Sequence, residues 1–378
     1  MVEEAFDKKK CEIAFVIGTR AELIKCFPLM LEFQKKKVPY YFIGTGQHNL
    51  TDFSEQFGVK RPDVVLSQEP EGSSKFNSVV SLALLWGVGV FFKIKRELMR
   101  LPSLKYVIYH GDTMSTGLAS VSSSRIFNWF KVYKNVHLEA GLRSFNNKEP
   151  FPEEMMRRIV TYFSDILLAV SNFSYENLKK YHQRKKVIKA GNTVIDSAYL
   201  ALDIAKKKKV KLLDKKPFAL VTIHRHENLV NKERLEKIVE ILDSVKIDTY
   251  FAIHDNSKRK FEDFGLLERL EKNKLIHLIQ PMDYVSFIYQ INKCSLIICD
   301  GGSMQEESLI FKKPCIILRY ATERPEGLST NFQFLTKFDI DKTKLKIKEY
   351  LSSDFKIKKF KNPYGKRGVS KKIVEVLR

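Results

Sequence analysis

The segment Cys-Glu-Ile-Ala-Phe-Val-Ile-Gly-Thr-Arg-Ala-Glu-Leu-Ile-Lys, residues 11–25, contains the pattern that decides the fold. A short apolar run, Ile13–Ile17, leads into Gly18 and then into a stretch of helical length. This succession predicts a buried strand, a tight turn and a helix. Because a helix N-terminus presents N–H groups and partial positive charge, the turn suits a diphosphate, helped by Arg20 and Lys25. An ordinary turn carrying surface cations is an equally good interpretation of this motif alone.

The same alternation continues along the chain and restarts in its second half. The expected strands are Ile13–Ile17, Tyr40–Ile43, Tyr106–Tyr109, Val132–Leu138 and Ile166–Val170, followed by Phe218–Ile223, Thr249–Ile253, Ile276–Leu278, Leu296–Cys299 and Cys315–Leu318. The pattern predicts an α/β fold with two Rossmann-like, doubly wound domains and a cleft between them. We expect an N-terminal domain over residues 1–192, a C-terminal domain over 193–362, and a last helix in 363–378 that packs back on the first domain.

Composition restricts the classes of protein to consider. The 378 residues are 44% hydrophobic, with 27 Phe and 15 Tyr, which suits two domains with large cores. The sequence has no apolar run of about 18 residues and no apolar signal core, so we expect a cytoplasmic protein without a membrane partner. The five cysteines form no CxxC pair and are expected to be buried free thiols. The net charge of +22 indicates a solvated basic surface and a field that attracts an anionic substrate; without a nucleic-acid motif, we expect no nucleic-acid partner.

Acidic residues stand at expected strand and helix ends in the first half. Asp112 follows a strand in His-Gly-Asp-Thr, although a helix cap explains it better in isolation. Glu139 ends an apolar strand in His-Leu-Glu-Ala-Gly-Leu-Arg-Ser, where an acid without a function is unusual. Glu153 and Glu154 follow Pro152 and open a helix, a position that the helix dipole favours for any acid.

The second half carries its own group of strand-end motifs. His224 lies in Thr-Ile-His-Arg-His-Glu-Asn, residues 222–228, where the spacing to His226 is not that of a helical metal site. We favour phosphate or sugar contacts there and expect no metal. Residues 300–307, Asp-Gly-Gly-Ser-Met-Gln-Glu-Glu, form a glycine turn into a helix that would cradle phosphate, with Glu307 placed to hold a ribose. The charged loop 322–326, which contains Arg324, suggests a further wall of the cleft or a plain surface loop.

Taken together, these motifs resemble the non-hydrolysing UDP-N-acetylglucosamine 2-epimerases. The resemblance runs from about Ile13 to the end of the chain. It rests on GTRAELIK (18–25), HGDT (110–113), HLEAGLRS (137–144), PEEMMRR (152–158), GNTVID (191–196), HRHEN (224–228), DGGSMQEES (300–308), TERPEG (322–327) and NPYG (362–365). The family implies a GT-B-like pair of domains with UDP in the cleft, a homodimer and a place in polysaccharide biosynthesis.

The resemblance also implies roles for individual residues. Asp112, Glu139 and Glu153 match acids that move protons, and His224 matches a catalytic and diphosphate-binding histidine. The matches to substrate-binding positions are Arg20, Lys25, Arg143, Phe287 (on uracil), Gly301, Gly302, Ser303, Glu307 and Arg324. The chain departs from the family at Ala21, where the family has Pro, and at Gly301, where it has a phosphate-binding Ser. Gln47-His48 resembles part of a regulatory site of the family.

The chemistry that fits these residues is elimination and re-addition. The C2 proton of an N-acetylhexosamine is not acidic, so either transient oxidation or departure of UDP from C1 must precede its removal. No GxGxxG follows an expected strand, because Gly87-Val88-Gly89 lacks the third glycine, and we expect no cofactor. Departure of UDP would let a carboxylate form 2-acetamidoglucal, with Glu139 or Asp112 taking the proton and Glu153 serving the other face. A hydrolysing 2-epimerase, an epimerase of a UDP-diacetamido-uronate and a GT-B glycosyltransferase remain as alternatives.

Overall fold

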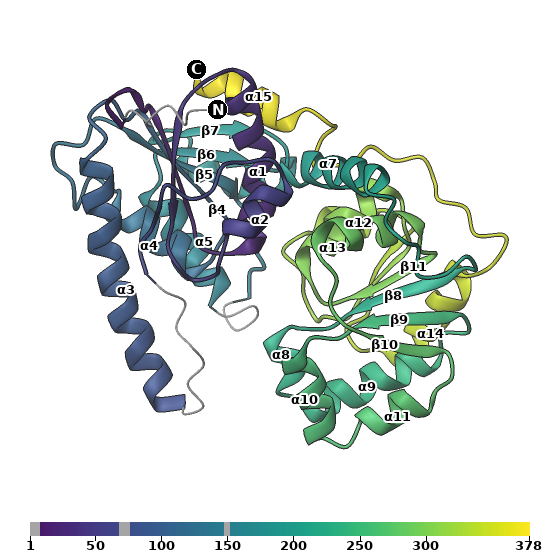
Figure 1. Cartoon of the computed structure of the whole chain (residues 1–378). Coiled ribbons are helices and arrows are strands. Elements are labelled where there is room, and N and C mark those ends of the chain that lie inside the picture. The colour runs from purple at the N-terminus through teal and green to yellow at the C-terminus, as the bar shows by residue number, and fades with distance from the viewer. Residues whose placement is uncertain (1–7, 68–75, 147–151) are drawn as a thin grey trace. The chain divides into compact units, whose positions relative to one another are not determined.

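The computed structural model describes residues 8–67, 76–146 and 152–378, and many of its elements are labelled in Figure 1. The chain forms two compact units. Unit 1 comprises Met1–Arg143, Phe151–Ser197 and Tyr364–Arg378, and unit 2 comprises Ser144–Pro150 and Ala198–Pro363. The helix α7 (Val194–Lys207) therefore begins in unit 1 and ends in unit 2, and the chain returns to unit 1 for its last residues.

Unit 1 contains a seven-stranded parallel sheet in the order β3-β2-β1-β4-β5-β6-β7. The strands are β1 (Ile13–Ile17), β2 (Tyr40–Gly44), β3 (Val64–Val65), β4 (Tyr106–His110), β5 (Lys134–Ala140), β6 (Ile166–Ala169) and β7 (Lys186–Lys189). The helices are α1 (Arg20–Lys35), α2 (Thr51–Gln56), α3 (Phe76–Met99), α4 (Met114–Ser122), α5 (Glu153–Phe163), α6 (Asn172–Asn177) and α15 (Val369–Leu377), with short 3₁₀ turns at Lys8–Lys10 and Lys179–Tyr181. Buried apolar strands and amphipathic helices make this the arrangement expected of βα units.

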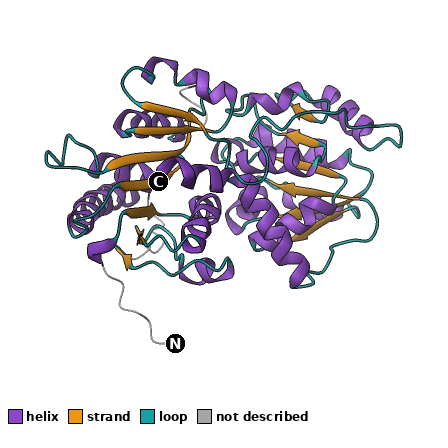
Figure 2. Ribbon diagram, turned by 90° about the horizontal axis from the view of Figure 1, so that it is seen from above, coloured by secondary structure: helices purple, strands orange, loops and turns teal. Residues whose placement is uncertain are grey.

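Unit 2 repeats the arrangement with six parallel strands in the order β10-β9-β8-β11-β12-β13. These are β8 (Phe218–Thr222), β9 (Asp248–Ala252), β10 (Ile276–Ile279), β11 (Leu296–Cys299), β12 (Cys315–Ile317) and β13 (Gln333–Leu335). The helices are α8 (His226–Leu229), α9 (Lys232–Asp243), α10 (Asp255–Asp263), α11 (Leu267–Lys272), α12 (Tyr284–Lys293), α13 (Gly302–Phe311) and α14 (Ile340–Tyr350), with a 3₁₀ turn at Pro325–Ser329. Figure 2 shows strands and helices interleaved in both units.

The prediction of two doubly wound α/β sheets is confirmed, and all ten expected strands are present. Three strands were missed. Each of these strands in the described residues, β3, β7 and β13, is two to four residues long and lies at a sheet edge, where strands are often too short to give a clear apolar run. The expected strand Val132–Leu138 was placed too early, because β5 runs on to Ala140 and includes Glu139.

In each sheet the strand order reverses at one point, and this point positions the candidate sites. The reversal lies between β1 and β4 in unit 1 and between β8 and β11 in unit 2. Open α/β sheets bind ligands beyond the carboxyl ends of the strands at such a reversal, because the connections leave in opposite directions there. The segments just beyond these four strands carry Arg20, at the start of α1, and the loop residues Asp112, His224 and Asp300.

The residues 191–196 attach the last helix, α15, to unit 1. Asp196 accepts hydrogen bonds from the backbone N–H of Gly368 at 2.6 Å and of Ser370 at 2.7 Å, which caps the start of α15. The apolar face of α15 is buried, including Ile373 and Val374, and α15 packs against α1.

All five cysteines are buried free thiols, as the sequence predicted. Gly87 and Gly89 lie within α3 rather than after a strand. Among the residues that the structure describes, no helix combines the length and apolarity needed to cross a bilayer.

Candidate active-site residues

The turn between β1 and α1 is held by a buried carboxylate. Glu22 accepts the backbone N–H groups of Gly18 at 2.6 Å and Thr19 at 2.9 Å, and the hydroxyl of Thr116 at 2.6 Å. Burial raises the pKa of Glu22, an effect opposed by these hydrogen bonds. Thr19 in turn caps α1, so the turn has the reciprocal geometry of a capping box. The start of α1, where the side chain of Arg20 is exposed, is therefore firmly placed.

Lys25 lies one turn further along α1, and its ammonium contacts Glu139. The distance from Lys25 Nζ to Glu139 Oε1 is 2.5 Å, and both side chains are only 6% exposed. The same oxygen accepts the side-chain N–H of Asn192 at 3.3 Å, and Nε2 of His110 lies 3.6 Å from the other oxygen, Oε2. A carboxylate that is buried and surrounded by donors has a fixed orientation, which a proton-transferring group needs.

The backbone of Glu139 has an unusual conformation. Its φ is +64°, and the register of β5 against β6 shifts between Leu138 and Ala140. A left-handed non-glycine residue costs about 1–2 kcal/mol, and such residues cluster at functional sites. The bulge directs the Glu139 side chain toward the loop after β4, where Oε2 lies 3.8 Å from the place that a Cβ on Gly111 would take.

Asp112 follows Gly111 in that loop and pairs with Arg157. Arg157 Nη2 lies 2.6 Å from Asp112 Oδ2, and Arg157 Nη1 lies 3.4 Å from the buried carboxylate of Glu154. The Asp112 side chain is 24% exposed, so it is reachable by a ligand. The ion pair with Arg157 therefore holds the Asp112 carboxylate in place while leaving part of it accessible.

The remaining predicted residues of unit 1 lie close in sequence to this group. Glu153 is the first residue of α5 and is half-buried. Arg143 is buried, and its guanidinium donates to the carbonyl of Leu142 at 2.7 Å and to the hydroxyl of Thr161 at 3.0 Å. Burial lowers the pKa of Arg143. The two hydrogen bonds hold its guanidinium in the interior of unit 1.

His137 supports the loop that carries Asp112. Its ring Nε2 lies 3.0 Å from the carbonyl oxygen of Gly111, which requires the proton on Nε2. Burial lowers the pKa of His137 to about 3, so the ring is neutral near pH 7. A neutral imidazole therefore joins β5 to the loop after β4.

In unit 2, Asp300 organises the loop after β8. Its carboxylate accepts the backbone N–H of His224 at 3.1 Å and of Arg225 at 2.9 Å, and the side-chain N–H of Asn228 at 3.1 Å. The His224 ring is 48% exposed, with Nδ1 3.4 Å from Asp300 Oδ1. Gly301 leaves room for it, since a Cβ at Gly301 would lie 3.0 Å from His224 Cε1. The absence of a side chain at Gly301 thus allows the His224 ring to approach the backbone there closely.

The N-terminus of α13 lies against a buried arginine. A Cβ on Gly302 would lie 2.4 Å from Arg324 Nη1, so the glycine permits close approach of the guanidinium. Arg324 Nε donates to Glu306 at 2.8 Å, and Arg324 also contacts Glu323. Because two buried acids offset the charge of Arg324, the feature suited to an anion is the N-terminus of α13 itself, with Arg324 held firmly beside it.

The other three predicted residues of unit 2 lie on α12 and α13. Ser303 is half-buried in the first turn of α13, and Glu307 is buried one turn further along. Burial raises the pKa of Tyr284, and the nearby Glu307 carboxylate adds to the shift. Phe287 is a half-buried residue of α12.

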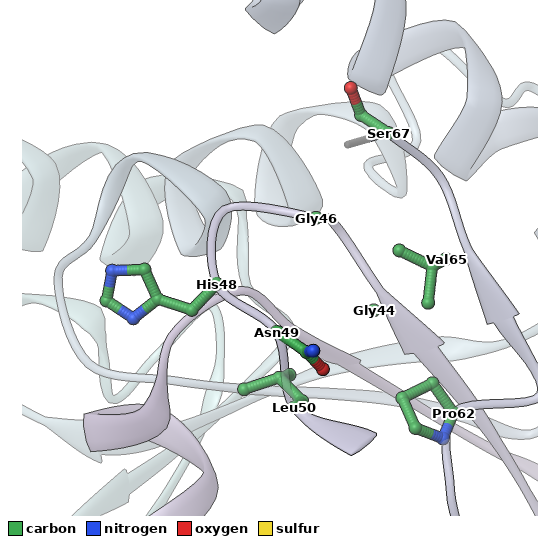
Figure 3. A pocket seen from close by; sticks show the side chains of 8 residues that line it. All are labelled: Gly44, Gly46, His48, Asn49, Leu50, Pro62, Val65 and Ser67. Carbon is green, nitrogen blue, oxygen red and sulfur yellow. The ribbon is translucent and has the colours of Figure 1, made fainter. Parts of the chain in front are cut away.

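A separate hollow of about 210 Å³ lies at the end of β2. Figure 3 shows its lining residues, Gly44, Gly46, His48, Asn49, Leu50, Pro62, Val65 and Ser67. In the sheet order β2 lies on the opposite side of β1 from β4 and β5. The hollow therefore does not include the acids described above.

Several residues that shape these sites had no role in the sequence prediction. For Glu22 a signal was present, since Thr19-x-x-Glu22 is the capping-box spacing. Arg157 and Asn192 lie within motifs quoted above. Nothing in the local sequence shows that Arg157 contacts Asp112 or that Asn192 contacts Glu139. Glu306 and Glu323 are buried acids whose common partner, Arg324, only the fold reveals.

Comparison with known proteins gives a consistent result. A family model described as UDP-N-acetylglucosamine 2-epimerase matches residues 32–378. The chain is 32% identical to a UDP-N-acetylglucosamine 2-epimerase of Methanococcus maripaludis, covering 97% of this chain and 98% of that protein. It is similar to the Methanocaldococcus jannaschii UDP-GlcNAc 2-epimerase solved with UDP-GlcNAc and UDP (TM-score 0.79) and to the Neisseria meningitidis enzyme bound to UDP-GlcNAc (TM-score 0.76). Each structure is 28% identical, with 97% of this chain and 99% of the solved chain covered.

Proposed function

The chain belongs to the UDP-N-acetylglucosamine 2-epimerase family, and we propose that it interconverts UDP-N-acetylglucosamine and UDP-N-acetylmannosamine. The observation that carries this proposal is the Glu139 carboxylate, buried at a strand end and held by Lys25. A carboxylate fixed in this way beside a second acid, Asp112, suits removal and return of a proton at carbon. The proposed enzyme class is an isomerase.

The proposed reaction is elimination followed by re-addition. UDP leaves C1 with the electron pair of the C1–O bond, and the positive charge that develops at C1 acidifies the C2 proton. A carboxylate takes this proton, the C2–H electrons form the C1=C2 bond, and the product is 2-acetamidoglucal. A proton then returns to C2 from the other face while UDP re-forms the bond to C1. Atoms and charge balance without an external oxidant.

In this proposal unit 2 holds the nucleotide. The N-terminus of α13 with Gly301, Gly302 and Ser303 receives phosphate oxygens, and the Arg324 guanidinium lies beside Gly302, held by Glu306. The exposed ring of His224 contacts the diphosphate as UDP departs. Glu307 holds the ribose hydroxyls, and Phe287 stacks on uracil. These groups stabilise the leaving group, which lowers the barrier to elimination.

Unit 1 acts on the sugar in the same proposal. Glu139 or Asp112 takes the C2 proton, and Glu153 serves the opposite face. Lys25 neutralises Glu139 and holds it in place, and the exposed Arg20 supplies positive charge for the diphosphate. Arg143 supports the loop that follows β5. Each acid–base group contributes about 10²–10⁴-fold to the rate.

Incubation with UDP-N-acetylglucosamine in deuterium oxide tests the proposal. We expect UDP-N-acetylmannosamine to form with one solvent deuterium at C2. Accumulation of UDP and free N-acetylmannosamine would instead identify a hydrolysing enzyme. Product and exchange only with a diacetamido-uronate nucleotide would identify that substrate, whereas absence of C2 exchange with every UDP-sugar would contradict an epimerase and favour a glycosyltransferase.

We also place the protein in the cytoplasm, in polysaccharide biosynthesis, as a homodimer. Five free thiols suit a reducing compartment. Exposed apolar side chains on unit 1 offer surface for a second copy, namely Phe92 on α3 and Trp129, Phe130 and Val132 between α4 and β5. Light scattering at micromolar concentration measures the oligomeric state, and a monomeric mass would contradict the dimer.

A further inference from the structure

Asn192 contacts Glu139 from a segment that comes more than fifty residues later in the chain. Its side-chain Nδ2 donates to Glu139 Oε1 at 3.3 Å, on the same oxygen that receives Lys25. Asn192 is 1% exposed, so this hydrogen bond is shielded from water. The orientation of the carboxamide is fixed by chemistry, because its Oδ1 accepts the backbone N–H of Val194 at 3.0 Å and must be the oxygen end.

The backbone of Asn192 is held by the last segment of the chain. Its N–H donates to the carbonyl oxygen of Tyr364 at 2.9 Å, and Tyr364 is fully buried. The preceding residue, Gly191, has a φ of +96°, and a Cβ there would lie 2.8 Å from the same carbonyl oxygen. The turn therefore requires glycine, and it fixes the direction in which Asn192 points.

Glu139 needs such support because its own backbone is strained. The residue holds a φ of +64° at a break in strand register, a conformation that persists only when the surroundings over-determine it. Lys25 and Asn192 both donate to Oε1, and together they fix the rotation of the carboxylate plane. This rotation sets the direction of Oε2, which faces the loop of Gly111.

We propose that Asn192 is a positioning residue that orients the Glu139 carboxylate for proton transfer at C2, an inference that rests on the function proposed above. Asn192 acts through Glu139 and touches no substrate in this proposal. Displacing a reacting group by about 1 Å can cost on the order of 100-fold in rate. Loss of the Asn192 carboxamide should therefore reduce turnover without weakening UDP binding.

The test compares Asn192→Asp and Asn192→Ser with wild type. The Asp side chain has the same shape and still accepts from Val194, but it places a second negative charge against Glu139 Oε1; the Ser side chain is too short to reach it. For both variants we expect kcat on UDP-N-acetylglucosamine to fall on the order of 100-fold. We expect KM and the calorimetric affinity for UDP to stay unchanged, and C2 deuterium exchange to fall in step with kcat.

Asn135 provides the matched control. It is a fully buried carboxamide at the start of β5 that donates to the carbonyl oxygens of Ser120 and Phe163, each at 3.3 Å. Asn135→Ser should lower the urea midpoint as much as Asn192→Ser and leave kcat per folded molecule unchanged. If Asn192→Asp does not fold, Asn192→Ser decides the result.

The possible outcomes separate the two proposals. Wild-type protein that neither makes UDP-N-acetylmannosamine nor exchanges deuterium contradicts the proposed function, and the role of Asn192 with it. Active wild type together with Asn192 variants that retain kcat contradicts only the positioning role. A fall in kcat that Asn135→Ser matches contradicts it too, because a general loss of stability then explains the effect.

Discussion

Lys25 Nζ and Glu139 Oε1 lie 2.5 Å apart in unit 1, in an ion pair joining α1 to the end of β5 across 114 residues of sequence. Both side chains are nearly inaccessible to water. Burying two charges costs free energy that their attraction seldom exceeds by much, so such a pair is weak evidence of stabilisation. Removing one partner is a different matter, because it leaves the other charge buried alone.

The first prediction concerns this pair. Glu139→Gln should lower kcat by about 10²–10⁴-fold, because it removes a proton-transferring group. Lys25→Met should lower the free energy of unfolding by about 3–5 kcal/mol, because Glu139 then loses its counter-charge in a buried site. The double variant Lys25→Met/Glu139→Gln should lose less stability than the sum of the losses in the two single variants. Urea denaturation gives the stabilities, and near-wild-type turnover by folded Glu139→Gln would refute the assignment.

The second prediction concerns the contact between Asp112 and Arg157. Arg157→Lys keeps the charge but loses the planar fork that reaches both Asp112 and Glu154, so kcat/KM should fall on the order of 100-fold. Because the two residues would act as a unit, adding Asp112→Asn to Arg157→Lys should lower kcat/KM only slightly more than the more damaging single change does. Arg158→Lys is the control, since the Arg158 side chain is 54% exposed and reaches Glu154 only at 3.4 Å. Additive losses for Asp112 and Arg157 would show that they act independently.

The third prediction concerns the glycine at the start of α13. Gly302→Ala would push a methyl group against Arg324, whose guanidinium is held by two buried acids. We expect UDP binding to weaken by about 1–3 kcal/mol, which is roughly 5- to 150-fold in the Kd of UDP. Gly89→Ala in α3 is the control, because nothing lies within 4 Å of the added methyl group and alanine favours a helix by about 1 kcal/mol. Calorimetric titration with UDP measures the effect, and equal affinities for the two variants would exclude a role of this close contact in binding.

The fourth prediction concerns the pH dependence of stability. Burial lowers the pKa of His137 from 6.5 to about 3 in the folded protein, so between these values the unfolded chain binds more protons. The stability that His137 contributes is complete above pH 6.5 and is lost as the pH falls toward 3, at up to about 1.4 kcal/mol per pH unit.

His137→Gln tests this dependence, because glutamine can donate to the Gly111 carbonyl without titrating. Between pH 7 and pH 5 wild type should lose about 2 kcal/mol more than this variant in urea denaturation. Parallel stability curves for the two proteins would mean that His137 is not buried in its neutral form.

Local sequence patterns determined much of this protein. The alternation of apolar runs such as Ile13–Ile17 and Leu296–Cys299 with helical segments predicted two parallel α/β sheets, since buried strands need continuous apolar sequence and βα crossovers need helical length. The glycine turns after these strands and the acid at Glu139 were also apparent. All of these features are encoded within about ten residues, which is the range over which backbone preference and hydrophobic periodicity act.

The tertiary structure decided what the sequence could not. The strand β1 pairs with β4, which comes almost a hundred positions later in the chain. This pairing brings together residues at the carboxyl ends of the two strands. The bulge that turns Glu139 toward Gly111, its contacts with Lys25 and Asn192, and the pairing of Asp112 with Arg157 all follow from that assembly. No local pattern specifies such contacts, because a buried charge finds its partner only when strand order, register and helix packing have placed both side chains in the same interior.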